Sequence, residues 1–194
     1  MRIVGGMWRG RPLEAPDGRD VTRPTTDRTR EQMASMVLSA FDLDLSEVRV
    51  LDAFAGSGAI GLELLSRGAE HCTFVDADRT AVARIKRNAS SLGASRAQYD
   101  VVGGDATKLV QRGALVGSPF SLVVLDPPYA MPAEDVTKLV DTLAEGGMLA
   151  PKALVLYERA SSGAQITPAG ATQLKSKSHG TTAVDLLRMG DSDE

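Results

Sequence analysis

From residue 48 onward, short apolar runs alternate with stretches of helical periodicity, and this alternation restricts the fold more than any other feature. The apolar runs, which we expect to be strands, cover residues 48–52, 72–76, 99–102, 121–126 and 153–158. The stretches after the first four runs, which we expect to be helices, cover residues 58–67, 78–92, 105–112 and 132–144. Strands that alternate with helices in this way form parallel βαβ units. The sequence therefore predicts a doubly wound α/β sheet.

The two ends of the chain depart from this alternation. Residues 171–178 and 181–189 read as two strands with no helix between them, so we expect a final antiparallel hairpin. A helix with Thr and Asp at its start is expected over residues 27–40. Before it, two short runs divided by a Gly-Gly pair suggest a small hairpin. We therefore expect residues 1–24 to form an arm beside a larger domain over residues 25–194.

Composition excludes several classes of protein. The chain has 194 residues, 43% of them hydrophobic and 24% charged, which is typical of one globular domain. Its single cysteine, Cys72, excludes an internal disulfide, and two histidines are too few for a His-based zinc site, so we expect no metal. No apolar run approaches the ~20 residues of a membrane span, and the N-terminus lacks a secretory pattern. We expect a cytoplasmic monomer with no membrane partner.

Charge is distributed unevenly along the chain. The net charge of −3, taken alone, argues against a nucleic-acid partner. However, residues 2–30 contain seven arginines against four acids, a local charge of +3. Because nucleic acid responds to local potential, this segment is a candidate contact for RNA phosphates.

A glycine-rich turn follows the first expected strand. Gly56, Ser57 and Gly58, together with Gly61, match the GxGxxG pattern that lets a nucleotide approach the backbone closely. The acid Asp52, at the end of the strand, would repel a phosphate and suits a cationic or hydroxyl-bearing ligand. S-adenosylmethionine fits this combination, because it has no phosphate and carries a sulfonium and an amino group. We therefore predict S-adenosylmethionine as the cofactor.

Two further acids follow the second and third expected strands. Asp76 lies about 20 residues after the turn, where an acid can accept hydrogen bonds from both ribose hydroxyls. It could instead cap the next helix, a role for which Asp78 competes. Asp105 has the same two interpretations, as a helix cap or as a contact for the adenine amino group. The predicted cofactor residues are Asp52, Ala53, Phe54, Gly56, Ser57, Gly58, Asp76, Ala77, Asp105 and Ala106.

The run Asp126-Pro127-Pro128-Tyr129 follows the fourth expected strand. A Pro-Pro pair cannot continue a sheet ladder, so it ends the strand and leaves carbonyls free to accept. An acid and a carbonyl together can hold an exocyclic amine by its two N–H bonds, which directs the nitrogen lone pair at a methyl donor. Tyr129 can stack on the base, a contact worth roughly 1–3 kcal/mol. We predict that these four residues are catalytic in a direct methyl transfer.

Taken together, these residues resemble the class I methyltransferases and, more narrowly, the bacterial 16S ribosomal RNA guanine-N2 methyltransferases of the RsmD family. The matching residues are Arg2-Ile3-Val4-Gly5-Gly6, the segment 22–31, the run from Asp52 to Gly61, Glu63, Ser66-Arg67-Gly68-Ala69, Asp76, the run from Asp126 to Tyr129, and Gly180-Thr181-Thr182. The resemblance implies a Rossmann-like, mostly parallel seven-stranded sheet with an antiparallel final hairpin.

The same resemblance implies an activity and a partner. It implies methylation of the N2 amine of a guanine in 16S ribosomal RNA, either free, in the 30S subunit or in an assembly intermediate. It also implies that the N-terminal arm contacts this RNA. The predicted RNA-binding residues are Arg2, Arg9, Arg11, Arg23, Arg28 and Arg30.

Three other functions remain open at this stage. A DNA adenine-N6 methyltransferase would share the chemistry, but the segment between Gly61 and Asp126 leaves little room for a target-recognition insertion. A non-catalytic RNA-binding module on the same fold would not require the intact run from Asp126 to Tyr129. A nicotinamide-dependent reductase would match GxGxxG, but it is disfavoured by the acid at Asp52 and by the lack of a proton-relay Tyr/Lys pair.

Overall fold

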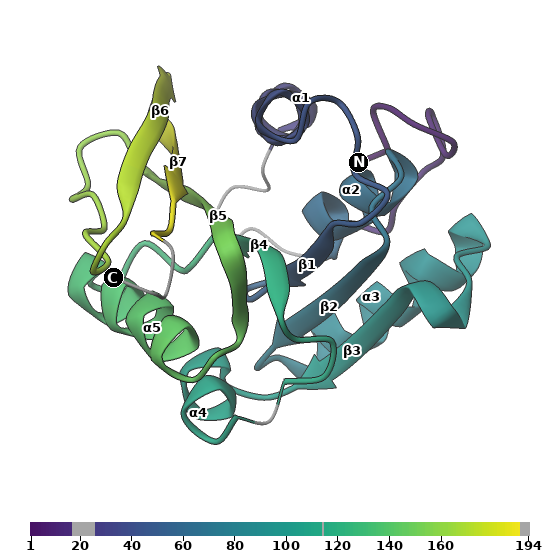
Figure 1. The fold of residues 1–194 in the computed structure, drawn as a ribbon. Coiled ribbons are helices and arrows are strands. Elements are labelled where there is room, and N and C mark those ends of the chain that lie inside the picture. Colours follow the sequence, from purple (N-terminus) through teal and green to yellow (C-terminus); the bar gives the residue numbers. More distant parts are fainter. Residues whose placement is uncertain (17–25, 114, 191–194) are drawn as a thin grey trace.

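The computed structural model describes residues 1–16, 26–113 and 115–190 (Figure 1). The strands are β1 (Arg49–Asp52), β2 (His71–Asp76), β3 (Tyr99–Gly103), β4 (Phe120–Leu125), β5 (Leu149–Ala160), β6 (Thr172–His179) and β7 (Thr182–Arg188). The helices are α1 (Asp27–Ala40), α2 (Ala59–Ser66), α3 (Arg79–Leu92), the short 3-10 turn η1 (Arg96–Gln98), α4 (Ala106–Gln111) and α5 (Ala133–Glu145). Every strand and helix expected from residue 27 onward is present, although β5 is longer than expected at both ends and η1 was not predicted.

The strands form one seven-stranded sheet in the order β3-β2-β1-β4-β5-β7-β6. The first five strands pair in parallel, while β7 pairs antiparallel with both β5 and β6. The parallel strands are nearly continuous apolar runs because helices cover both faces of the sheet. This arrangement confirms the predicted doubly wound sheet with an antiparallel final hairpin.

Helices cover the two faces of the sheet (Figure 1). Helices α1, α2 and α3 pack on one face, where their apolar side chains meet strand residues such as Val50, Val124 and Leu156. Helices α4 and α5 pack on the other face, against residues such as Leu51 and Leu125. Because side chains alternate between faces along a strand, each buried strand contributes to both layers of the core.

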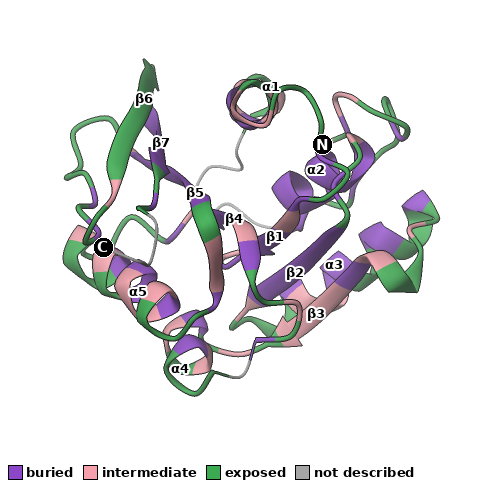
Figure 2. Ribbon diagram, in the orientation of Figure 1, coloured by how far each residue is buried: buried purple, intermediate pink, exposed green. Residues whose placement is uncertain are grey.

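Strand β6, the last in the order of the sheet, is exposed. All eight residues of β6 are accessible to solvent, whereas β7 beside it is mostly buried (Figure 2). Strand β6 is therefore an edge of the sheet that none of the described helices covers. Its pairing with β7 shifts register between Gln173 and Lys175.

The N-terminal residues 1–16 fold back on themselves with only one β-bridge, between Arg2 and Pro12. The expected hairpin is therefore an irregular loop of hairpin shape rather than a pair of regular strands. Its apolar side chains Ile3, Trp8 and Leu13 are buried in the same core as α1, α2 and α3. The segment is thus anchored by packing as well as by backbone hydrogen bonds.

Two further observations bear on partners. No helix in the described ranges is long and apolar enough to cross a membrane. Within the same residues, no cluster of three or more His, Cys, Asp or Glu side chains could hold a metal ion.

Candidate active site and cofactor pocket

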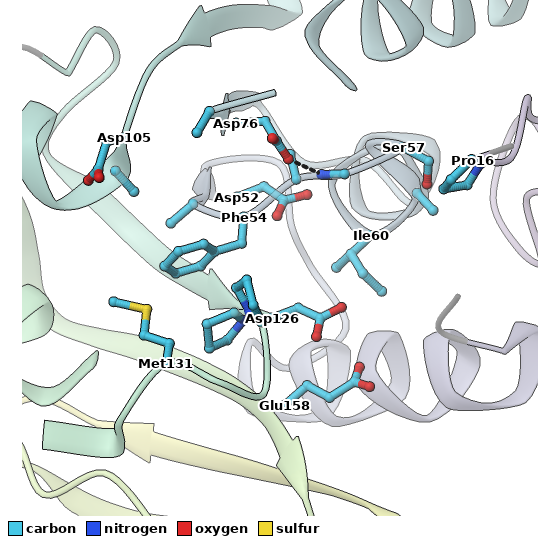
Figure 3. Close-up of a pocket in the computed structure, with 18 of the residues that line it drawn as sticks. Pro16, Asp52, Phe54, Ser57, Ile60, Asp76, Asp105, Asp126, Met131 and Glu158 are labelled. Atoms are coloured by element: carbon cyan, nitrogen blue, oxygen red, sulfur yellow. Dashed lines mark hydrogen bonds between the residues drawn. The ribbon is translucent and has the colours of Figure 1, made fainter. Parts of the chain in front are cut away.

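A cavity of about 410 Å³ opens at the carboxyl ends of the parallel strands (Figure 3). This is the edge at which open α/β sheets bind their ligands. The cavity is lined by Met1, Pro16, Asp52, Ala53, Phe54, Ala55, Gly56, Ser57, Ala59, Ile60, Asp76, Ala77, Gly104, Asp105, Ala106, Thr107, Asp126, Pro127, Pro128, Tyr129, Met131 and Glu158. The structure therefore brings the predicted catalytic residues and all the predicted cofactor residues except Gly58 to one cavity.

The lining is strongly acidic. Five carboxyl groups face the cavity, and no lysine or arginine lines it among the residues that the structure describes. The five acids are Asp52, Asp76, Asp105, Asp126 and Glu158. Such a lining repels phosphate groups and attracts a cation. It fits S-adenosylmethionine, whose sulfonium and amino groups are cationic, and does not fit the pyrophosphate of a dinucleotide.

Asp52 lies at the floor of this cavity, at the end of β1. Asp52 is 2% exposed, and one oxygen of its carboxyl, Oδ2, accepts a hydrogen bond from the Gly61 N–H at 3.2 Å. Burial, together with the smaller effect of the charges of Asp126 and Asp76, outweighs the lowering effect of the Gly61 N–H and raises the pKa of Asp52 to about 7. A buried acid with this pKa gains stabilisation from a ligand that brings a positive charge or hydroxyl donors.

The glycine-rich turn is shaped around Asp76. The Gly56 N–H donates to Asp76 Oδ2 at 2.7 Å, a bond drawn dashed in Figure 3. Gly56 has φ +55°, which glycine adopts without strain. At Gly61, a Cβ atom would lie 2.3 Å from the Phe74 ring, so this glycine lets α2 pack closely on β2. The turn thus presents its backbone to the cavity.

Gly58 is the exception among the predicted cofactor residues, because it does not line the cavity. It precedes the first residue of α2 with φ +77°, and a Cβ there would press on Ile85 at 3.2 Å. Contact between Gly58 and the cofactor therefore stays a prediction. The role of Gly58 in the fold is to turn the chain into α2 against α3.

The two interpretations of Asp76 are separated by the geometry. Asp78 caps α3, because its Oδ1 accepts from the Thr80 N–H at 2.8 Å. Asp76 instead accepts from the Asp78 N–H at 2.9 Å and from the turn, and it faces the cavity. Asp105 combines the two positions: its Oδ1 caps α4 by accepting from the Lys108 N–H at 3.2 Å, and the residue also lines the cavity.

The Asp126-Pro127-Pro128-Tyr129 run leaves the sheet directly after β4. The Pro128 carbonyl accepts from the Met131 N–H at 2.8 Å and so closes a turn. The Pro127 carbonyl accepts no hydrogen bond within the described ranges, so of the two proline carbonyls it is the one available to a substrate. Tyr129 is 53% exposed at the rim, where its ring is accessible to a stacking partner. The run therefore places a carboxylate, a carbonyl and an aromatic ring together.

Four of the predicted RNA-binding arginines are on the surface. Arg2, Arg9, Arg11 and Arg28 are exposed. Arg2 pairs with Asp27 at 3.3 Å in solvent, a contact of small energy, and Arg11 donates to a backbone carbonyl of α3. Arg23 lies outside the described residues.

Arg30 differs from these arginines, and the prediction that it contacts RNA is wrong. Its side chain is 1% exposed. Its guanidinium donates to the Arg2 carbonyl and to Asp27 Oδ1, both at 2.6 Å. Arg30 therefore joins α1 to the N-terminal segment from inside the protein and is not accessible to phosphate groups.

Sequence reasoning missed several residues of the cavity. Glu158, at the end of β5, is buried and faces it. The rule that located Asp126 and Asp52, an acid at the carboxyl end of a parallel strand, applies equally to Glu158 and could have identified it. Met1 and Pro16 come from the N-terminal segment, and no pattern in the sequence indicates that this segment borders the cavity.

The fold and the site together define a class I methyltransferase that uses S-adenosylmethionine. Comparison with known proteins narrows this class. A family model described as Conserved hypothetical protein 95 matches residues 1–188. The chain belongs to this family, the RsmD family, which confirms the resemblance seen in its sequence.

Individual relatives agree with this assignment. The chain is 35% identical over 197 residues to a protein named Ribosomal RNA small subunit methyltransferase D from Escherichia coli (strain K12), covering 100% of this chain and 93% of that protein. Among solved structures, it is similar to a putative methyltransferase, yhhF, from Escherichia coli, with a TM-score of 0.79, 32% identity and 98% of each chain covered. It is also similar to the putative methylase HI0767 from Haemophilus influenzae, with a TM-score of 0.78, 29% identity and 98% of each chain covered.

Proposed function

We propose that this protein methylates the exocyclic N2 amine of a guanine in 16S ribosomal RNA, with S-adenosylmethionine as the methyl donor. The observation that carries the proposal is the placement of the Asp126 carboxylate and the Pro127 carbonyl at the rim of an acidic cofactor cavity. The relative named Ribosomal RNA small subunit methyltransferase D supports ribosomal RNA as the substrate class.

The residues of the turn and of the strand ends would hold the cofactor. Asp76 and the backbone of Gly56 face the part of the cavity that suits a ribose, and Asp105 with Ala106 lies beside them. Asp52 and the neighbouring acids suit the cationic end. When bound, the cofactor supplies a methyl group on a sulfonium, which is already activated for transfer.

Asp126 and Pro127 would position the amine. The two N–H bonds of the amine donate to the Asp126 carboxylate and to the Pro127 carbonyl, so the nitrogen lone pair faces the cavity. Tyr129 would hold the base by stacking, and a base in a duplex must be unstacked to reach it. Catalysis then comes mainly from orientation and from exclusion of water, and Asp126 need not act as a strong base.

The N-terminal segment would bind the RNA. We assign residues 1–24 to an RNA-binding arm and residues 25–194 to the methyltransferase domain, as the sequence predicts. The exposed side chains of Arg2, Arg9 and Arg11 support this proposal because they lie on the segment that borders the cavity through Met1. The substrate could then be recognised by its shape around the target base rather than by overall charge.

The test is transfer of tritium from labelled S-adenosylmethionine to 16S ribosomal RNA, and to 30S particles, from a strain that lacks this protein. The modified base is then mapped. Asp126→Ala should lower turnover by at least about 100-fold, because the amine loses its orientation. Its affinity for S-adenosylmethionine should remain near that of the wild type.

Asp135→Ala, on the exposed surface of α5, is the matched control and should keep full activity. Near-normal turnover of Asp126→Ala would overturn the assignment of Asp126. Transfer to DNA adenine instead of ribosomal RNA would favour the alternative substrate, and no transfer to either would favour a binding module.

A further inference from the structure

Glu158 is the neighbour of Asp126 across two parallel strands. Leu125 of β4 pairs in register with Tyr157 of β5, so the next residues along the two strands are Asp126 and Glu158. Adjacent strands lie about 4.8 Å apart. Leu125 and Tyr157 both belong to the core on the α4 and α5 face, so Glu158, the next residue of β5, points to the opposite face. Asp126 follows the end of β4, and both acids line the cavity at the carboxyl ends of the strands. Figure 3 shows both carboxyl groups in the cavity.

Glu158 also lies where two cavities meet. A second cavity of about 220 Å³ adjoins the cofactor cavity, and Tyr157, Arg159 and Ala160 line it further out. The residues shared by both cavities are Pro127, Pro128, Tyr129, Met131 and Glu158. A base stacked on Tyr129 with its amine at Asp126 would therefore have its adjoining edge against Glu158, which is 5% exposed.

We propose that Glu158 accepts a hydrogen bond from N1–H of the target guanine and so selects guanine over bases that lack this proton. The proposal rests on the proposed function and deepens it, because it assigns the choice of base to one residue. On the Watson–Crick edge of guanine, N1–H stands directly beside the N2 amine, so these two neighbouring positions are both donors, while the O6 acceptor lies beyond N1. The two neighbouring carboxylates, Asp126 and Glu158, present acceptors only, and the two sets are complementary.

Adenine fails this match. Its exocyclic amine stands beside an unprotonated N1, whose lone pair would face the Glu158 carboxylate. Two acceptors that face each other repel, so a base with a lone pair at this position is disfavoured relative to a base with N1–H. The same geometry that permits methylation of guanine would therefore disfavour adenine-N6 methylation by this chain.

The test replaces the target guanine by 2-aminopurine, which keeps the 2-amino group but has an unprotonated N1. 16S ribosomal RNA carrying either base at the mapped position is made by ligation and assembled into 30S particles. We expect the wild-type protein to methylate the guanine substrate roughly 10- to 100-fold faster than the 2-aminopurine substrate. Glu158→Gln should methylate both at similar rates, because the amide can donate to N1 as well as accept from N1–H.

Further variants separate this role from a structural one. Glu158→Ala should lower the guanine rate and also lose the preference, since it offers no acceptor. Glu145→Gln, at the exposed end of α5, should keep the wild-type ratio. A purely structural role for Glu158 would lower both rates together and leave their ratio unchanged. Melting temperature and S-adenosylmethionine affinity of each variant report whether it is folded.

The outcomes distinguish the inference from the proposed function. A wild-type ratio near one, or an unchanged ratio in both folded Glu158 variants, would overturn the inference alone. If either variant fails to fold, the ratio measured with the other one decides. Absence of wild-type transfer to the guanine particle would overturn the proposed function and this inference with it.

Discussion

The cofactor cavity and the N-terminal segment 1–16 border each other, yet they are built in opposite ways. The cavity is formed by side chains that project from the ends of regular strands, whose backbones are held by the sheet ladder. The segment has one β-bridge, and in addition to its own backbone hydrogen bonds it is held by side chains from a helix. Both oxygens of buried Glu63, on α2, accept from it, at 2.7 Å from Val4 N and at 2.8 Å from Gly5 N.

Further contacts continue this pattern. Ser66 Oγ accepts from the Trp8 N–H at 2.9 Å and donates to the Gly5 carbonyl at 2.7 Å, and the Met7 N–H donates to the Ser66 carbonyl at the end of α2. The two regions therefore respond differently to substitution. The cavity is supported by the backbone ladder of the sheet, whereas the segment depends on a few buried polar side chains in addition to its apolar packing.

The largest effect on stability is expected from Glu63→Ala, which removes the side chain that anchors the N-terminal segment to α2. It leaves two backbone N–H groups and Arg67, 2.8 Å from Glu63, without their partner. The free energy of unfolding should fall by about 3–5 kcal/mol, measured by urea denaturation. Below its melting temperature the variant should still bind S-adenosylmethionine while RNA methylation falls. A loss below about 1 kcal/mol would show that packing, not Glu63, anchors the segment.

The free energy of unfolding should depend on pH through Asp52, which lies in the cofactor cavity. The pKa of Asp52 is raised to about 7, so the folded state holds a proton that the unfolded state has released above pH 4. The free energy of unfolding should therefore decrease as pH rises, by about 3 kcal/mol between pH 5 and pH 8, and should level off above the folded pKa.

Asp52→Asn removes this titration. Its stability should exceed that of the wild type most at pH 8, and the difference should narrow toward pH 4, when both are measured without cofactor. The same variant should bind S-adenosylmethionine more weakly. Parallel pH profiles for the two proteins would contradict the pKa of Asp52.

Two glycines of the segment give a smaller, matched contrast. Gly6 and Gly10 both have positive φ, +76° and +83°. A Cβ at Gly6 would lie 1.9 Å from the Ser66 carbonyl oxygen, while a Cβ at Gly10 would meet nothing within 4 Å. Gly10→Ala should cost about 1 kcal/mol from backbone strain alone. Gly6→Ala should cost about 1–3 kcal/mol more, because it pushes the segment off α2. Equal losses in thermal unfolding would refute a close approach at Gly6.

The smallest effect concerns the surface of the segment. Arg9→Ala should weaken RNA binding a few-fold and reduce the salt slope of the affinity by about one, as expected for one lost phosphate contact. Arg112→Ala, an exposed arginine after α4, is the control and should change neither quantity. Filter binding of the 16S ribosomal RNA at several salt concentrations measures both. An unchanged slope for Arg9→Ala would remove Arg9 from the RNA interface.

The same contrast explains what could be predicted from the sequence. Asp52, Asp76 and Asp126 were located because parallel strands place their carboxyl ends at one edge, so a strand pattern alone fixes the position of the acids. Arg30 was misplaced because burial of an arginine depends on partners distant in the chain, here the Arg2 carbonyl. The position of Gly58 outside the cavity lining was not predicted, because a glycine motif does not distinguish contact with a ligand from the turn of the chain into a helix.

Strand β6 has a consequence for how the protein behaves at high concentration. An exposed edge strand offers unpaired backbone groups to a second molecule and can seed association of sheets. Lys175 and Lys177 lie on this strand, and the register shift beside Lys175 interrupts its regular ladder. Burying these ammonium groups between two copies would be unfavourable, so the lysines protect the protein from aggregation along its one open edge on this side of the sheet.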